Sequence, residues 1–409
     1  MAKSSWTLLL VAFFTGVIAA LVQFAIPPVL PLIREQYQVS YTDSALLMSL
    51  FALATVASAI PGGFIMPKFG VRAIGLWGLG ILLAGLVGFA LSTSFPFLVI
   101  MRIVQGFGFG LIAVAAPSAI GQYIPQEKMS IAMGIWSAWI PFSSMTMFFF
   151  APKIIQFSMN TYWILLISLT LIVILFFART IPRPMAKETG SFIPAKQDLL
   201  AELKNANLWW AGGGFATYSL AFLTFNTWIT TVLVESASIP LASATIVPAL
   251  LAIFAIWSNV FAGAIYKKSG YPLLLFVMPP LAIACLWPMF TLGQTTLLYS
   301  SAIIIGCLGG FVPAILFTAV PLLAKRKETV GIGLSMVIFM QNVGGLIGPQ
   351  FFGSLRQNTG GFASGFWMLL LFGLFTVYAC YKIWRTGIFA TGIKAKEPVL
   401  KDTVLSREA

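Results

Sequence analysis

The hydrophobic pattern of this chain consists of long apolar stretches, which are separated by short polar connections and contain almost no charged residue. Each stretch is close to the roughly 20 residues that a helix needs to cross the ~30 Å hydrocarbon core of a bilayer. The pattern therefore predicts twelve membrane-spanning helices. We place them at Trp6–Leu32, Asp43–Met66, Ile74–Thr93, Phe95–Ser118, Ser130–Ala151, Met159–Ala178, Asn207–Leu233, Leu241–Tyr266, Tyr271–Gly293, Thr295–Leu323, Val330–Gly353 and Phe362–Lys382.

Composition supports a polytopic membrane protein of the all-α class. Hydrophobic residues make up 59% of the 409 residues and charged residues 9%, whereas a soluble domain carries about 25% charged residues. A net charge of +13 would suit a nucleic-acid partner if the basic residues gathered on one folded surface. They are sorted by loop instead, so we expect lipid contacts and no nucleic-acid partner.

The basic residues show which side of the membrane each loop faces. Of the 24 Lys and Arg residues, Arg34, Lys153 and Arg356 fall on one side, Arg102 lies within a stretch, and all others fall on the side of the two termini. Loops rich in Lys and Arg remain cytoplasmic, and their charge faces anionic lipid headgroups. The sequence predicts cytoplasmic termini and a bacterial inner-membrane location.

A polar segment divides the chain into two equal apolar blocks. Residues 179–206 carry several prolines and charges, as expected of a boundary between domains. The predicted organisation is an N-terminal six-helix bundle (1–178), a cytoplasmic linker (179–206), a C-terminal six-helix bundle (207–384) and a cytoplasmic tail (385–409).

The two blocks resemble each other at an offset of 200 residues. Gly63, Lys68 and Gly70 align with Gly263, Lys268 and Gly270, and Gly106 and Gly110 align with Gly306 and Gly310. Such a duplication predicts two pseudo-symmetric bundles. Transporters with parallel repeats of this kind bind substrate between the repeats near the middle of the membrane.

The fourth stretch carries the most informative motif. Its segment LVIMRIVQGFGFG, Leu98–Gly110, resembles the LxxxRxxQGxG motif of the major facilitator superfamily, a family of secondary transporters with two six-helix bundles. The resemblance implies that Arg102 and Gln105, which share one helix face, take part in substrate attraction or coupling. The alternative is that Arg102 is a structural hub, donating hydrogen bonds to carbonyls of a neighbouring helix.

A second motif lies between the second and third stretches. Gly63–Arg72, GFIMPKFGVR, resembles the superfamily's GxxxDRxGRR motif, which implies a gating role for Gly63, Lys68, Gly70 and Arg72. Pro67 stands at the position of the usual aspartate. We therefore expect the gate to close through contacts other than that carboxylate.

Within the superfamily, Met133–Ala138 (MGIWSA) is similar to the cyanate and nitroimidazole transporter family. Members of that family often carry an arginine in the middle of the first helix. Gln23 is the most polar residue of the corresponding region here, which makes it a candidate for substrate contact.

The lack of carboxylates and histidines deep within the predicted helices limits the possible mechanisms of energy coupling. No carboxylate lies deep in a predicted helix and the chain has no histidine, whereas proton-driven transporters commonly use buried titratable groups. Three transport mechanisms remain open, namely facilitated diffusion, exchange, and symport of a substrate that carries its own proton. A membrane interior with one cation favours a negative substrate, so we expect a small organic anion.

Several aromatic and amide side chains are further candidates for substrate contact. They are Trp136, Trp139, Asn226, Trp228, Gln341 and Asn342. Aromatic rings could stack on a planar or amphipathic ligand, which favours the alternative function of exporting hydrophobic compounds. The same rings could pack in the bundle, and the amides could join helices.

Other function classes find little support. An enzyme would need a nucleophile with its base, a metal set or paired carboxylates, and Cys285, Cys307 and Cys380 lack disulfide or metal spacing. No phosphate-binding GxxxxGK[ST] loop is present. We expect a monomeric, non-enzymatic transporter of a small molecule, with no cofactor or metal.

Overall fold

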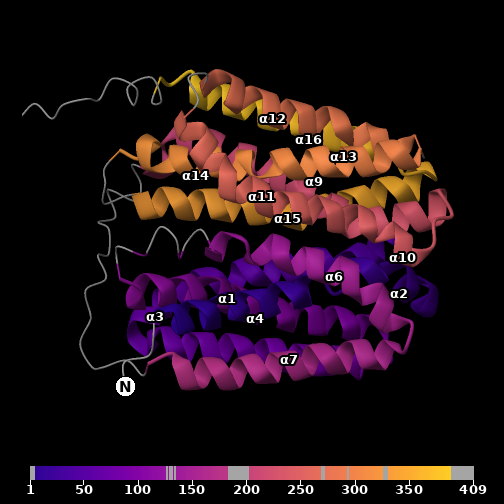
Figure 1. Cartoon of the computed structure of the whole chain (residues 1–409). Helices are drawn as coiled ribbons and strands as arrows, with labels where there is room; N and C mark the ends of the chain where they lie inside the picture. Colours follow the sequence, from indigo (N-terminus) through magenta and orange to yellow (C-terminus); the bar gives the residue numbers. More distant parts are fainter. Residues whose placement is uncertain are drawn as a thin grey trace, which may run out of the picture.

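The computed structural model describes residues 5–125, 128, 132, 135–182, 202–268, 272–292, 294–325 and 330–387. Within these ranges the regular structure is helical, and the helices form two groups that lie side by side (Figure 1). We call residues 5–182 the N half and residues 202–387 the C half. The predicted fold of two six-helix bundles is confirmed.

The helices of the N half follow the predicted stretches closely. They are α1 (Ser5–Phe24), the 3₁₀ helix η1 (Pro27–Val29), α2 (Leu30–Tyr37), α3 (Tyr41–Ala90), α4 (Phe95–Tyr123), α6 (Trp139–Ile155) and α7 (Met159–Thr180). The second and third predicted stretches together form α3, which turns at Gly70 with φ 81° and ψ 156°. Glycine suits this turn because a positive φ costs it little.

The C half contains the remaining helices. They are α9 (Ala206–Ser236), α10 (Leu241–Ala244), α11 (Ile246–Lys268), α12 (Pro272–Leu286), η2 (Trp287–Thr291), α13 (Thr295–Gly309), α14 (Phe311–Leu323), α15 (Val330–Thr359) and α16 (Ala363–Trp384). The predicted stretch Thr295–Leu323 is thus two helices, which meet at Gly310.

Eleven segments of the described chain are long and apolar enough to cross a membrane. The remaining predicted stretch, Val330–Gly353, lies in the 30-residue helix α15. We name the two ends of the bundle after residues of α3: the Tyr41 end, where α3 begins, and the Arg72 end, where it turns.

The repeat at an offset of 200 is visible in the packing. A Cβ on Gly106 would come within 3.0 Å of the Phe51 carbonyl, and a Cβ on Gly306 would meet the carbonyl of Leu251 in the same way. Gly110 and Gly310 likewise leave no room beside Ser58 and Ser258. Close backbone approach therefore requires glycine at equivalent places in both halves.

This packing gives a matched pair of test substitutions on α4. Gly110→Ala should destabilise the protein by about 1 to 3 kcal/mol, because the methyl group would overlap Ser58 and the Thr55 carbonyl. Gly121→Ala should be tolerated, since a Cβ there meets nothing within 4 Å. Thermal unfolding in detergent compares the two variants. Equal midpoints would contradict the close approach of α3 and α4.

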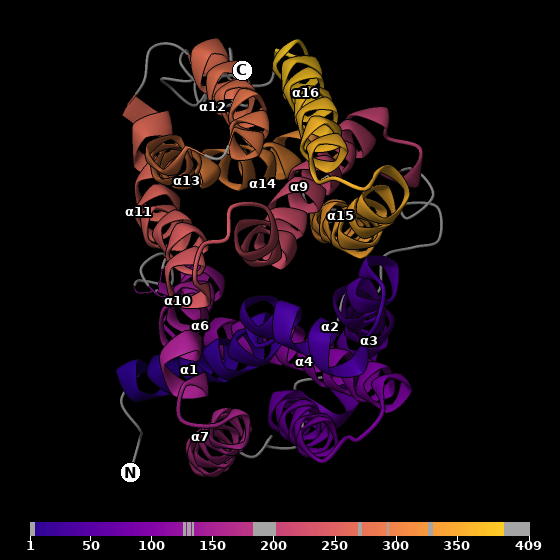
Figure 2. The ribbon, with the colours of Figure 1, turned by 90° about the vertical axis from the view of Figure 1, so that its right-hand side faces the viewer.

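The halves meet along two main seams. In one, α3 of the N half packs against α15 of the C half, and in the other α6 packs against α11. Near the Tyr41 end, η1 and α2 also contact α9. Figure 2 looks onto this end and shows the two groups of helices facing each other, with α3 beside α15 and α6 beside α10.

Candidate functional site

A cavity of about 880 Å³ lies between the halves toward the Arg72 end. It is lined by side chains of α3, α4, α9 and α15 and by Leu203. Most of this lining is apolar, including Trp209, Met336 and Phe339; its polar members are Ser118, Ser335 and Asn342. The described residues that line the cavity carry no charge, so an ion inside it would lack a direct partner there.

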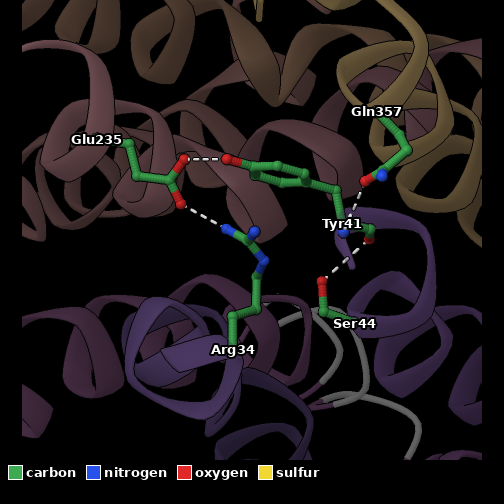
Figure 3. Close-up of polar contacts among 5 residues, drawn as sticks. All are labelled: Arg34, Tyr41, Ser44, Glu235 and Gln357. Carbon is green, nitrogen blue, oxygen red and sulfur yellow. Dashed lines mark hydrogen bonds and ion pairs between the residues drawn. The ribbon is translucent and has the colours of Figure 1, made fainter. Parts of the chain in front are cut away.

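The Tyr41 end is closed by a polar cluster that spans both halves (Figure 3). Arg34 of α2 forms an ion pair with Glu235 of α9, and the Tyr41 hydroxyl donates a hydrogen bond to the other Glu235 oxygen. The Tyr41 backbone N–H donates to the side-chain oxygen of Gln357 in α15, with an N–O distance of 3.4 Å. We call Arg34, Tyr41, Glu235 and Gln357 the gate cluster.

Cation–π contacts with the Tyr41 ring reinforce the gate cluster. The guanidinium carbon of Arg34 lies 3.4 Å from the centroid of the Tyr41 ring, and that of Arg356 lies 4.5 Å from it. Cation–π contacts of this kind strengthen when they are shielded from water. Beneath the cluster, the Trp228 ring packs against Tyr41 and its indole N–H donates to the Pro349 carbonyl at 2.9 Å. Trp228 is fully buried here.

One polar contact joins the halves at a deeper level. The Ser144 hydroxyl of α6 donates to the side-chain oxygen of Asn226 in α9, with an O–O distance of 3.4 Å. Asn226 is fully buried and its amide nitrogen donates to the Phe222 carbonyl at 2.8 Å. In this conformation, Asn226 therefore links α9 of the C half to α6 of the N half. Joining helices is one of the two roles predicted for it.

Arg102 is enclosed within the N half. Its side chain is 0% exposed, and it donates to the carbonyls of Leu47 at 2.8 Å, Val22 at 3.0 Å and Gln23 at 3.2 Å and to the side-chain oxygen of Gln105 at 2.7 Å. The Phe51 ring lies under the guanidinium at 4.3 Å. Gln105 in turn donates to the Gly85 carbonyl at 3.0 Å. This geometry matches the predicted structural hub.

A break in the first membrane-spanning segment explains why the Gln23 carbonyl needs a donor from another helix. Pro27 has no N–H to bond the Gln23 carbonyl four residues earlier, and α1 ends at Phe24. Arg102 supplies the donor to Gln23, and the Tyr162 hydroxyl supplies one to the nearby Ala25 carbonyl at 2.7 Å. Two long polar side chains thus donate hydrogen bonds to the free carbonyls at this helix break inside the membrane, where unpaired carbonyls are costly.

The predicted aromatic pair is part of the packing of the N half. Trp136 and Trp139 stack on each other with centroids 5.0 Å apart and lie against Gly16 of α1, where an added Cβ would clash with Trp136. Both rings are 8% exposed, and neither lines the 880 Å³ cavity.

The remaining predicted residues are spread along the bundle. Asn342 and Gly63 line the cavity, whereas Gln23 and Gln341 are half-buried outside its lining. Lys68 is exposed with its ammonium 5.3 Å from the Phe69 ring. The Arg72 guanidinium donates to the Ala178 carbonyl at the end of α7. Gly70 forms the turn of α3.

The gate cluster was not predicted from the sequence. The available signal was the scarcity of charge on the Tyr41 side, where Arg34 and Glu235 are among the few ionised residues at helix ends. Their pairing could not be derived from that pattern, because the two residues are 201 positions apart and belong to different halves.

This chain has two helical bundles, a cavity between them and a polar closure at one end. This is the architecture of a membrane transporter. The profile described as "Major Facilitator Superfamily" matches residues 12–349, and the chain belongs to this family. It is a secondary transporter and not an enzyme.

Curated relatives cover much of the chain at low identity. The chain is 24% identical to the "Hexuronate transporter" of Bacillus subtilis over 94% of both chains. It is 26% identical to the "Nitrite extrusion protein" of the same organism, over 76% of this chain and 77% of that one.

Among solved structures, a bacterial homologue of the human lysosomal transporter Spinster, in an inward-facing and unoccupied conformation, superposes with a TM-score of 0.76. It is 15% identical and covers 98% of this chain and 100% of that chain. This likeness concerns the fold.

Proposed function

We propose that this protein transports a small organic anion by alternating access, with residues 1–178 and 207–384 moving as two units. The supporting observation is that Arg102 is a buried cation whose described hydrogen-bond partners are all uncharged. Its positive charge is therefore not neutralised by a direct ionic partner. In a medium of low dielectric constant such a charge attracts an anion over several ångströms.

The relatives are consistent with this substrate class. Those that match most of the chain include proteins named for hexuronate, an organic anion, and for nitrite, an inorganic one. Because Arg102 is enclosed, we infer that it acts through its field, while Asn342 on the cavity wall offers a hydrogen-bond donor to the anion. Gln105 and Gln23 would contribute by holding Arg102 in place.

We infer the orientation from the distribution of basic residues. The linker and both termini face the cytoplasm of a bacterial inner membrane in this proposal, and the Arg72 end faces it as well. The conformation with a closed gate cluster and a cavity toward the Arg72 end is then the inward-facing state. Lys68, Gly70 and Arg72 would shape the cytoplasmic turn of α3.

A second candidate is the export of hydrophobic or amphipathic compounds. The specific observation that favours it is the apolar wall of the cavity, with Trp209, Met336 and Phe339 and no charged residue among its described lining. Large aromatic and Met side chains adapt to varied apolar ligands. Transport assays with both classes of compound separate the candidates.

The test is uptake into proteoliposomes of a panel that includes glucuronate, galacturonate, nitrite and amphipathic cations. We expect saturable uptake of an organic anion. Gly63→Trp should reduce that uptake at least tenfold, because the ring would occupy the cavity and obstruct closure of the seam between α3 and α15. Gly121→Trp is the control, since Gly121 is outside the cavity lining and faces open space.

Uptake of amphipathic cations alone, sensitive to Gly63→Trp, would replace the anion proposal by the export proposal. Uptake unaffected by Gly63→Trp would show that the 880 Å³ cavity is not on the transport path.

A further inference from the structure

A second pocket, of about 440 Å³, lies in the seam between α3 and α15 toward the Tyr41 end. Its walls come from both halves: Ser49 and Leu50 belong to α3, and Ile347, Gln350 and Phe351 belong to α15. It shares no lining residue with the 880 Å³ cavity. The pocket is large enough for a small ligand.

Two polar atoms in this wall have no hydrogen-bond partner. The Ser49 hydroxyl belongs to a side chain that is 3% exposed, and it is unpaired. The side-chain oxygen of Gln350 is also buried and unpaired, while its amide nitrogen donates to the Thr42 carbonyl at 3.1 Å. Buried polar groups are nearly always paired, so two in one pocket indicate a missing polar partner.

The rim of the pocket is apolar and exposed. Ile347 is 47% exposed and Phe351 is 44% exposed. Exposed apolar side chains of a membrane-spanning helix face lipid where they do not line a cavity, and neither residue lines the 880 Å³ cavity. A ligand can therefore enter from the bilayer, which restricts it to molecules that dissolve there.

We propose that this pocket binds a membrane-soluble amphiphile with an apolar body and a hydroxyl head. A hydroxyl can donate to the Gln350 oxygen and can accept a hydrogen bond from the Ser49 hydroxyl, so this one group suits either atom. A carboxylate has no proton to donate to Gln350, an ammonium has no lone pair for Ser49, and an alkane offers neither. The apolar body contacts Leu50, Ile347 and Phe351.

Binding at this place has a consequence for transport. The pocket exists because α3 and α15 are in contact near the gate cluster, and opening of the Tyr41 end would separate its two walls. A ligand that binds one conformation better than the other shifts the population toward it. The amphiphile should therefore hold the Tyr41 end closed and slow turnover, whichever substrate the main cavity carries.

The experiment uses photolabelling of the full-length protein in liposomes. The probe is a ten-carbon primary alcohol that carries a diazirine in its chain, and the comparison compound is its methyl ether, which accepts but cannot donate a hydrogen bond. We expect saturable labelling of peptides from α3 and α15 by the alcohol. Labelling by the ether should be weaker by roughly fivefold to tenfold, as the loss of one hydrogen bond implies.

Three variants complete the test. Ser49→Ala should reduce labelling by the alcohol toward the level of the ether, and Ser49→Phe should abolish it by filling the pocket. Ser300→Ala is the control, because the Ser300 hydroxyl bonds within α13, and its labelling should equal that of the wild type.

Equal labelling by alcohol and ether in the wild type would overturn the proposal even if a variant failed to fold. Undiminished labelling of Ser49→Phe would overturn it as well. These outcomes do not depend on the anion proposal, which is tested at the other cavity.

Discussion

Arg102→Ala is expected to abolish transport and to lower the stability of the protein by about 2 to 6 kcal/mol. The estimate assigns about 1 to 3 kcal/mol to each carbonyl that loses a buried donor. It counts the carbonyls of Gln23 and Val22, because the Leu47 carbonyl lies within the helix α3 and the Val22 carbonyl keeps only a long bond of 3.4 Å from the Ala25 N–H. The break before Pro27 removes the helical donor that Gln23 would otherwise have, so no rearrangement within α1 restores it.

Two conservative variants separate the charge of Arg102 from its hydrogen bonds. Arg102→Lys retains the charge but lacks the planar fork that reaches the Leu47, Val22 and Gln23 carbonyls together. Arg102→Met removes both the charge and the donors at similar length. Both should lose stability. In the anion proposal, the lysine variant should retain the KM for the anion and the methionine variant should raise it.

The measurements are thermal unfolding in detergent and initial uptake in proteoliposomes, with KM and maximal rate determined separately. A methionine variant with the wild-type KM would refute attraction of the anion by Arg102 and leave the structural hub alone. An alanine variant with wild-type stability would refute the hub.

The twelve stretches were predictable because the membrane imposes one length and one polarity on every crossing segment. The glycine repeat was predictable for a related reason: Gly106 and Gly306 meet a facing carbonyl at equivalent places, where no other residue fits. The length rule acts on each segment separately, and the glycine repeat is visible as a match between two segments, so both can be recognised without knowing how the helices are arranged.

The side-chain environments were not predictable in the same way. The sequence left two roles for Arg102, which are substrate attraction or coupling and a structural hub. The hub depends on carbonyls freed near Pro27 on another helix, and the hydropathy pattern does not show that the two places meet. Helix bounds also differ from the prediction, since Gly310 divides one predicted stretch into α13 and α14. Such features follow from tertiary packing, which a hydropathy pattern does not contain.

Removal of Glu235 is expected to open the Tyr41 end. Glu235→Ala eliminates the ion pair with Arg34 and the hydrogen bond from the Tyr41 hydroxyl. The Arg34 and Glu235 side chains are 14% and 28% exposed, so the pair is partly shielded from water. We estimate a loss of about 1 to 2 kcal/mol, which corresponds to roughly a fivefold to thirtyfold shift in population.

The shift can be measured with a cysteine below the gate cluster. Ser49 of α3 is 3% exposed and lies in the seam with α15, where it lines the 440 Å³ pocket. In a background with Cys285, Cys307 and Cys380 replaced by alanine, Ser49→Cys should react slowly with a membrane-impermeant maleimide while α3 and α15 are in contact. Glu235→Ala should raise the reaction rate by the same fivefold to thirtyfold factor, because the rate follows the open fraction.

Glu35 provides the matched control. It stands 200 positions before Glu235, is exposed beside Arg34 and has no part in the gate cluster. Glu35→Ala removes the same charge from the same end of the bundle, so it should leave the labelling rate unchanged. Equal acceleration by both variants would mean that surface charge, not the gate cluster, controls the rate.

An exchange of the two charges tests the ion pair itself. Glu235→Arg alone places two guanidinium groups together and should accelerate labelling more than Glu235→Ala, since like charges repel at short range. Adding Arg34→Glu restores an ion pair of reversed polarity and should recover part of the protection, without the acceptor that Glu235 offers Tyr41. If the double variant labels as fast as Glu235→Arg, the ion pair does not hold the Tyr41 end closed.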